Sequence, residues 1–143
     1  MIEFHVDRTS SVPAYAQIVQ QVREALRLGL LNTGDRLPTV RDVVVSCTVN
    51  ANTVLKAYRE LEHAGLVEAR QGSGTFISGK LGTVEPQHMA RLRTRLARWV
   101  AEAREAGLED EDMQALVTSV LAEEPAADER AAERSAAAKE GIA

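Results

Sequence analysis

Apolar side chains recur at intervals of three and four residues between residues 13 and 30, with glutamines and charged residues between them. This spacing is typical of an α-helix that buries one face. Pro13 suits the first turn, where its missing N–H is not needed, and Gly29 with the polar cluster at residues 32–35 ends the helix. Residues 1–10 are expected to form an exposed lead-in. The expected inward face consists of Tyr15, Ile18, Val19, Val22, Ala25, Leu26 and Leu30.

Two shorter helices are predicted next. Thr39 with Asp42 three residues later has the spacing of a capping box, so a helix should span residues 40–46. Residues 47–49 form a turn, and Asn50 is placed to cap a third helix. Gly65 suits the left-handed position that follows a helix and should end it. The inward face of this third helix is expected to be Val54, Ala57, Tyr58 and Leu61.

Two short extended runs, residues 66–70 and 75–78, flank a glycine-rich turn with the sequence QGSG. This arrangement predicts a β-hairpin. Two strands alone are marginally stable and need the helices beneath them. The fold class is therefore mainly α with a small β-hairpin, in which residues 1–80 form a winged helix-turn-helix domain for binding DNA.

The rest of the chain predicts a short helical region and a tail. After a linker that contains Gly82 and ends at Pro86, two amphipathic helices separated by Gly107 should occupy residues 81–124. Their apolar stripes are too large to stay exposed in so small a piece, so we expect a dimerisation region; the alternative is that both helices fold back on the winged domain. Residues 125–143, rich in alanine and charge, should be disordered or weakly helical. The expected dimer interface is Leu92, Leu96, Trp99, Val100, Met113, Leu116, Val117 and Val120, with Leu121 beside them.

Composition narrows the function further. The single Cys47 excludes an internal disulfide, and no Cys or His cluster has metal-ligand spacing, since His5, His63 and His88 are scattered. No apolar run is long enough for a membrane span and no signal peptide is recognisable, so a cytoplasmic location without membrane partners is expected. No nucleophile–base pair or phosphate loop is recognisable either, which argues against an enzyme and against a cofactor.

Charge is divided unevenly along the chain. The net charge is −4, but residues 1–80 carry nine Lys/Arg and eight Asp/Glu, a net +1, and residues 81–143 carry a net −5. A net +1 is a weak electrostatic footprint for a domain that binds double-stranded DNA. Phosphate contacts should therefore come from local groups of basic side chains and from backbone N–H groups.

The side chains that should read DNA are those on the outward face of the third helix, because a helix-turn-helix places its second helix in the major groove. Asparagine can pair with adenine, and lysine with guanine or phosphate. Asn50 could instead serve only as the cap, and the next two as an ordinary solvated face. Arg41, a cation in a first helical turn, should hold phosphate unless it is merely a surface arginine. The candidates are Asn50, Asn52, Thr53 and Lys56 on the helix, Arg41 ahead of it, and Arg70, Gln71, Gly72 and Ser73 in the wing.

The runs GDRLPTVRDV and VNANTVLKAYRELEHAGLVEARQGSGTFI resemble the winged helix of the GntR family of bacterial transcriptional regulators. The opening PAYAQIVQQVREAL and the short C-terminal part resemble its YtrA subfamily. The resemblance matches Arg41 to the arginine that grips the DNA backbone, and the other candidates to the recognition helix and wing. Ala51 and Leu55 stand where relatives carry base-reading arginines, and Thr48 stands where a turn glycine is common. The operator of those relatives should not be transferred.

The resemblance implies a homodimeric repressor that binds an inverted-repeat operator, with its own operon and transporter genes as the target. The alternative function is a protein-interaction adaptor that uses a winged helix without reading DNA, since fold does not fix function. A small-molecule effector is left open, because two helices of modest length offer little room for a pocket. Cys47 occupies a position that is usually aliphatic, and we expect a small buried core residue there rather than a redox switch.

Overall fold

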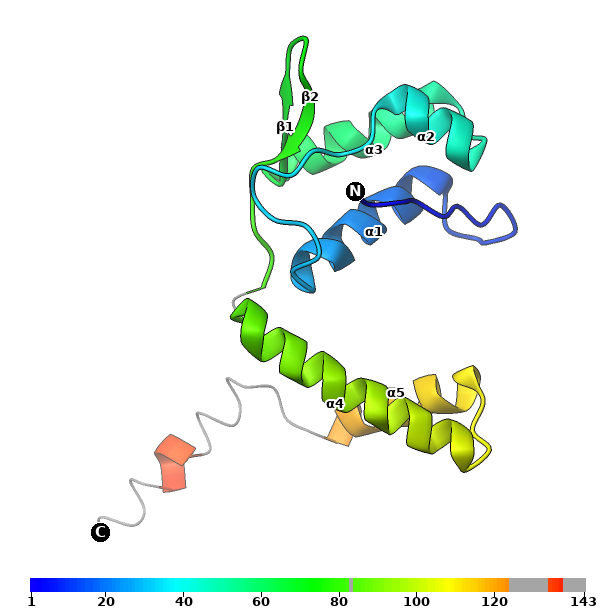
Figure 1. Ribbon diagram of the computed structural model, residues 1–143, viewed down its shortest axis with the longest axis vertical. Coiled ribbons are helices and arrows are strands. Elements are labelled where there is room, and N and C mark those ends of the chain that lie inside the picture. The colour runs from blue at the N-terminus through cyan, green and yellow to red at the C-terminus, as the bar shows by residue number, and fades with distance from the viewer. Residues whose placement is uncertain (83, 124–133, 138–143) are drawn as a thin grey trace. The chain divides into compact units, whose positions relative to one another are not determined.

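The computed structural model describes residues 1–82, 84–123 and 134–137. These divide into two compact units, Met1–Ala90 and Arg91–Ala143. The predicted fold class is confirmed, since three helices precede an antiparallel hairpin and further helices follow it (Figure 1). The prediction for the tail falls mostly on residues outside the described part of the chain. The elements are α1 (Ala14–Arg27), α2 (Val40–Cys47), α3 (Ala51–His63), β1 (Val67–Arg70), β2 (Gly74–Ile77), α4 (Pro86–Glu105) and α5 (Asp110–Glu123).

The core of the first unit lies between α1 and α3, with α2 and the start of the hairpin closing it. Burying this apolar surface is the main force that holds the three helices together. The predicted inward faces of α1 and α3 are confirmed, apart from Leu30 and a half-buried Tyr15. The largest fully buried side chains here are Ile18, Val22, Leu37, Val43, Val54, Leu61 and Ile77.

The assignment of Leu30 to the α1 stripe was wrong. The helix ends at Arg27, and Leu30 is 63% exposed. Gly29 adopts a left-handed φ of 73° there, a conformation that glycine tolerates and that redirects the chain. Leu31 turns inward instead, with its N–H bonded to the Ala25 carbonyl at 3.2 Å.

The expectation that residues 1–10 form an exposed lead-in was also wrong. Phe4 is only 6% exposed and belongs to the core. Two glutamine side chains of α1 form hydrogen bonds with the backbone of this segment, as a neighbouring β-strand would. The Gln21 amide accepts from the N–H of His5 at 3.0 Å and donates to its carbonyl at 2.7 Å, and Gln17 does the same for Asp7 at 2.8 Å in each direction. Polar side chains of α1 thereby satisfy backbone groups, as buried or docked backbone requires.

Cys47 is half-buried rather than fully buried as predicted. Its Sγ lies 3.1 Å from the Phe4 carbonyl, to which it donates, so it helps to hold the N-terminal segment. The next residue, Thr48, ends α2 in the left-handed region at φ 53°, which a β-branched residue adopts only at a cost. Arg8 of the N-terminal segment donates to the Thr48 carbonyl. The turn between α2 and α3 is thus stabilised from outside.

The capping box predicted at the start of α2 is confirmed. The Thr39 hydroxyl accepts from the Asp42 N–H at 3.1 Å, and the Asp42 carboxylate accepts from the Thr39 N–H at 3.3 Å. Two of the N–H groups that a helix start leaves unpaired are satisfied in this way. The capped start places α2 against α3, and with it Arg41 in the first turn.

Tyr58 joins α3 to the segment that leads into α2. Its hydroxyl donates to the Pro38 carbonyl at 2.6 Å inside the core. Burial, with a contribution from the Asp42 carboxylate, raises the pKa of Tyr58 well above its usual range, so the phenol stays neutral. Proline has no N–H, so this carbonyl is the only backbone hydrogen-bonding group at that position.

Replacing Tyr58 by phenylalanine is expected to lower the free energy of unfolding by about 1–2 kcal/mol, because the Pro38 carbonyl is then buried without a donor. Urea denaturation followed by circular dichroism measures this loss. Tyr15→Phe is the matched control, since Tyr15 is less buried and is used through its ring. Equal stability losses in the two variants would show that the Tyr58 hydroxyl is not what stabilises the junction.

The hairpin pairs β1 with β2 in antiparallel register, Val67 opposite Ile77 and Arg70 opposite Gly74. A third segment, which the sequence did not indicate, extends this ribbon. The N–H of Leu37 bonds to the Thr75 carbonyl at 2.9 Å, and Arg36 forms a bridge with Phe76. The wing is therefore anchored along one edge of β2 as well as by β1.

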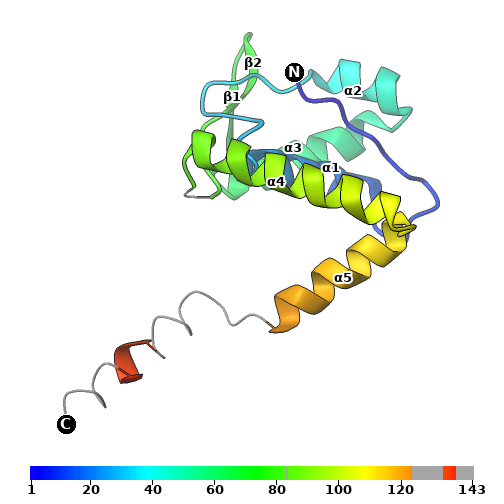
Figure 2. The ribbon, with the colours of Figure 1, turned by 60° about the horizontal axis from the view of Figure 1, so that its bottom comes forward.

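The second unit contains most of α4 and all of α5. Gly107, at φ 94°, turns the chain after α4, and the helices diverge from the turn at residues 106–109 (Figure 2). Arg104 and Asp110 form a salt bridge of 2.9 Å across this turn. Ala103 and Met113 are buried near it. No helix in the described ranges combines the length and apolar character needed to cross a bilayer.

Candidate nucleic-acid interface

The outward face of α3 carries the predicted reading residues on its first two turns. Asn52 and Lys56 are exposed and Thr53 is half-buried, while the opposite face packs into the core. Thr53 borders a shallow groove whose other wall is the N-terminal segment, residues 6–8 and 10. The helix is thus held from behind with its N-terminal polar side chains presented outward, as a recognition helix requires.

Asn50 acts as the N-cap of α3, which is one of the two roles predicted for it. Its Oδ1 accepts from the Asn52 N–H at 2.8 Å. A bidentate contact to adenine needs both the oxygen and the nitrogen of the amide. In this geometry the oxygen is engaged, so Asn50 is better suited to positioning Asn52 than to reading a base itself.

Lys56 is positioned by an aromatic ring that belongs to α1. Its Nζ lies 4.0 Å from the centroid of Tyr15, a cation–π contact. Lys56 nevertheless remains exposed. Sequence reasoning placed Tyr15 in the core stripe and missed this contact, because only the packing of α1 on α3 brings the two side chains together. Tyr15 therefore limits the freedom of the ammonium group that faces outward from α3.

Arg41 is exposed in the first turn of α2. Within the described part of the chain, no carboxylate lies at salt-bridge distance from it. A cation near a helix N-terminus is slightly unfavourable, and Arg41 has no ion pair to offset this. The geometry is compatible with the phosphate contact predicted for it.

The wing presents Arg70, Gln71, Gly72 and Ser73 at its exposed tip. The Ser73 N–H bonds to the Arg70 carbonyl at 3.0 Å, and Gly72 has the left-handed φ of 77° that this tight turn requires. The Arg70 guanidinium lies 4.5 Å from the centroid of Phe76 and 3.7 Å from the Glu68 carboxylate. Both charged side chains are largely exposed, so this ion pair is weak and leaves Arg70 available.

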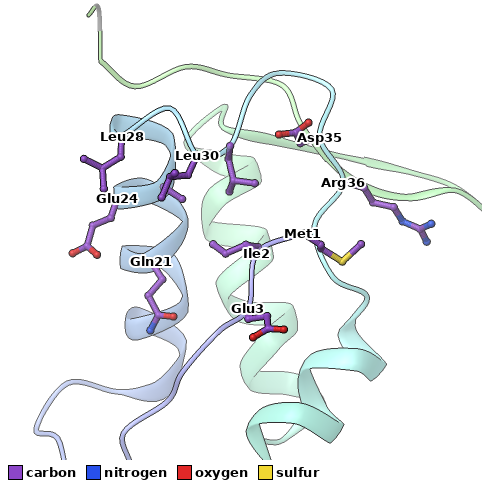
Figure 3. A pocket seen from close by; sticks show the side chains of 11 residues that line it. Met1, Ile2, Glu3, Gln21, Glu24, Leu28, Leu30, Asp35 and Arg36 are labelled. Atoms are coloured by element: carbon purple, nitrogen blue, oxygen red, sulfur yellow. The ribbon is translucent and has the colours of Figure 1, made fainter. Parts of the chain in front are cut away.

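The first unit also contains an open groove between its N-terminal residues and the end of α1 (Figure 3). Ile2 and Leu31 contribute apolar surface. The carboxylates of Glu3, Glu24 and Asp35 line the groove, and Arg36 lies at its edge toward the wing. A surface with this charge repels phosphate. The interior of the groove is therefore less suited to DNA than the surface formed by α3 and the wing.

The predicted dimer residues lie on α4 and α5, and they differ in exposure. Met113 is buried in the helical hairpin that α4 and α5 form, and Trp99 and Val100 are half-buried beside it. The other predicted residues are exposed large apolar side chains: Leu92, Leu96, Leu116, Val117 and Val120, together with Leu121. Among the described residues, no group of three or more His, Cys, Asp or Glu side chains could hold a metal ion.

The pattern of the bacterial regulatory proteins of the gntR family matches residues 14–77 of this chain. Over 120 residues the chain is 38% identical to the HTH-type transcriptional repressor YtrA of Bacillus subtilis, an alignment that covers 82% of this chain and 92% of YtrA. The chain belongs to the GntR family. It is a DNA-binding transcriptional regulator, and the resemblance to the YtrA subfamily is confirmed.

Two further matches agree with this family. The chain is 41% identical over 115 residues to the HTH-type transcriptional regulator Rv1152 of Mycobacterium tuberculosis, covering 80% of this chain and 91% of that protein. A solved structure of a transcriptional antiterminator from Listeria monocytogenes is similar, with a TM-score of 0.54 at 31% identity, covering 83% of this chain and 90% of that one. These likenesses extend past the winged helix into the C-terminal helices.

The GntR family pattern covers α1 to β2, since it matches residues 14–77. The N-terminal segment that Gln17 and Gln21 hold lies before the match. Ala51 and Leu55 are respectively exposed and half-buried on α3. Neither residue adds positive charge to the exposed face of α3, on which Asn52 and Lys56 lie.

Proposed function

We propose that this GntR-family protein is a repressor that binds an inverted-repeat operator as a homodimer, one recognition helix per half-site, in the cytoplasm. The observation that carries the proposal is the arrangement of α3, whose buried face fixes it in the core while Asn52 and Lys56 face outward. Two copies related by a two-fold axis present two such helices about one turn of DNA apart.

Within this proposal, the candidate residues have different tasks. Asn52, Thr53 and Lys56 contact base edges, with Asn50 positioning the first of them. Arg41 holds the phosphate backbone ahead of the turn. The wing tip, residues 70–73, contacts the minor groove or its phosphates from the side, where Gly72 permits close backbone approach.

The proposed dimer uses the helices of residues 81–124, separate from the DNA-binding domain of residues 1–80. The helical hairpin of α4 and α5 leaves several large apolar side chains exposed, namely Leu92, Leu96, Val120 and Leu121. Exposed apolar side chains in such number mark an interaction site, and packing against a second copy would bury these side chains in both protomers. Trp99, half-buried at the same face, would anchor the interface.

Gel shift with the DNA upstream of the protein's own gene tests the reading role. Wild-type protein should bind with an affinity that falls as salt rises, and the double variant Asn52→Ala, Lys56→Ala should lose discrimination between this DNA and a scrambled duplex, since each good base contact contributes about 1–3 kcal/mol. Glu60→Ala and Glu62→Ala, exposed on the same helix, are the controls. Discrimination that survives the double variant would remove α3 from the reading role.

The same experiment separates the proposal from its alternative, an adaptor that uses the winged helix to bind another protein. An adaptor would bind neither duplex at any salt concentration. The start of α3 favours DNA because its candidate contact residues are amides, a hydroxyl and a cation, with no large apolar anchor of the kind that protein interfaces use among them.

A further inference from the structure

Arg36 is a cation that lies on the wing although it is distant from the wing in sequence. Arg36 forms an antiparallel bridge with Phe76. The backbone on either side of it is hydrogen-bonded to β2: the Ile77 N–H donates to the Asp35 carbonyl at 2.8 Å, and the Leu37 N–H donates to the Thr75 carbonyl at 2.9 Å. Side chains alternate across a strand. Since Leu37 points into the core at 1% exposure, Arg36 points to the outer face of the wing.

Gly74 provides the space in which the Arg36 guanidinium lies. A Cβ at Gly74 would be 2.9 Å from Arg36 Nε and 3.3 Å from one of its terminal nitrogens. Any side chain there would displace the guanidinium, and the φ of 121° at Gly74 also excludes other residues. In Figure 3, Arg36 points away from Gln21 and Glu24 and toward the side on which the wing strands run.

A second guanidinium shares this face. Arg70 pairs with Gly74 in the strand register and packs over Phe76, the bridge partner of Arg36. Opposite residues of an antiparallel pair point to the same face, about 5 Å apart. Arg36 and Arg70 therefore flank one aromatic ring beside the turn that forms the wing tip.

The two guanidinium groups are only partly paired with carboxylates. Glu68 pairs only with Arg70, and the Asp35 carboxylate is turned to its own loop, where it accepts from the Asn32 N–H at 2.8 Å. Over the residues that the structure describes, no carboxylate is within salt-bridge distance of Arg36. Two exposed guanidinium groups on a narrow ribbon suit a phosphodiester, because arginine donors match phosphate oxygens.

We propose that Arg36 is a further DNA-contacting residue, which binds a backbone phosphate at the edge of the minor groove that the wing enters. The inference rests on the proposed function, since it needs the wing to lie on DNA. It extends the wing surface from the tip, residues 70–73, to a segment ahead of α2. It also explains how a domain of net charge +1 gathers local positive charge.

The test is the salt dependence of binding for Arg36→Gln, which removes the charge, and for Arg36→Lys, which keeps it. Two probes are used, the DNA upstream of the protein's own gene and sonicated genomic DNA, because a phosphate contact affects both equally. Arg36→Gln should bind both probes a few-fold more weakly and reduce the slope of log K against log salt by about 0.9. Arg36→Lys should restore the slope. Arg27→Gln, the same charge change at the far end of α1, should leave the slope nearly unchanged.

An unchanged slope in Arg36→Gln would overturn the inference, and so would a loss of binding that matches a loss of folded protein in thermal denaturation, since the residue would then only support the wing. Failure of the proposed function looks different. In that case the wild-type protein itself binds neither probe, or binds both without preference, whatever residue stands at position 36.

Discussion

Leu61→Ala is expected to lower the free energy of unfolding by about 2–5 kcal/mol, the usual cost of deleting a buried leucine side chain and leaving a cavity. Leu61 is fully buried in the core that α3 forms with α1, and its carbonyl accepts from the Leu66 N–H at 3.0 Å where the chain turns toward β1. A domain of this size has only about 5–15 kcal/mol of stability. The variant should therefore be partly unfolded at growth temperature and lose DNA binding in proportion.

Urea denaturation monitored by circular dichroism measures this effect, and the binding assay is repeated at a temperature where the variant is folded. Leu55→Ala is the control, because Leu55 lies on the same helix but is only half-buried. It should cost much less stability. If the two variants lost the same stability, the core between α1 and α3 would not be the principal source of stability. If Leu61→Ala failed to bind DNA while folded, Leu61 would affect the reading surface directly.

The helices and the hairpin could be predicted because each has a local signal. The apolar period of α1, the Thr39 capping box and the glycine turn at residues 71–74 act over a few residues, and all three elements are present. The predictions that were wrong concern contacts between residues that are far apart in the sequence. Gln17 and Gln21 have the spacing of a solvated helix face, yet their amides bind the backbone of the N-terminal segment. The periodicity of the sequence does not reveal a polar side chain that takes the hydrogen-bonding role of a neighbouring strand.

The candidate site shows the same division. The outward positions of α3 follow from helix geometry once its inward face is known, so Asn52 and Lys56 could be chosen from the sequence. The contact of Lys56 with Tyr15 and the bridge of Arg36 with Phe76 depend on how separate elements pack. A strand is recognised by the alternation of apolar and polar residues, and a single bridged residue is too short to show it. Arg36 was therefore not among the predicted DNA-binding residues.

Leu96→Asp is expected to convert the proposed homodimer into a monomer and to weaken operator binding by about 10²–10⁴-fold, the range over which linking two binding modules raises affinity. Leu96 is 54% exposed on α4, so an aspartate there is tolerated by the isolated hairpin. In a dimer it would place an unpaired carboxylate in an apolar interface, which is strongly unfavourable. Size-exclusion chromatography with light scattering gives the mass, and fluorescence anisotropy gives the affinity.

Ala101→Asp is the matched control, since it adds the same charge at an exposed position on the opposite side of α4. It should remain a dimer and bind like the wild type. A wild-type monomer at micromolar concentration, or a Leu96→Asp variant that stays dimeric, would contradict the proposed interface. The size of the affinity loss carries a further conclusion. Because the winged domain has a net charge of only +1 and lacks arginines at Ala51 and Leu55, each half-site should be bound weakly. Specific repression would then require two domains held together, which makes the C-terminal helices as necessary for operator binding as α3.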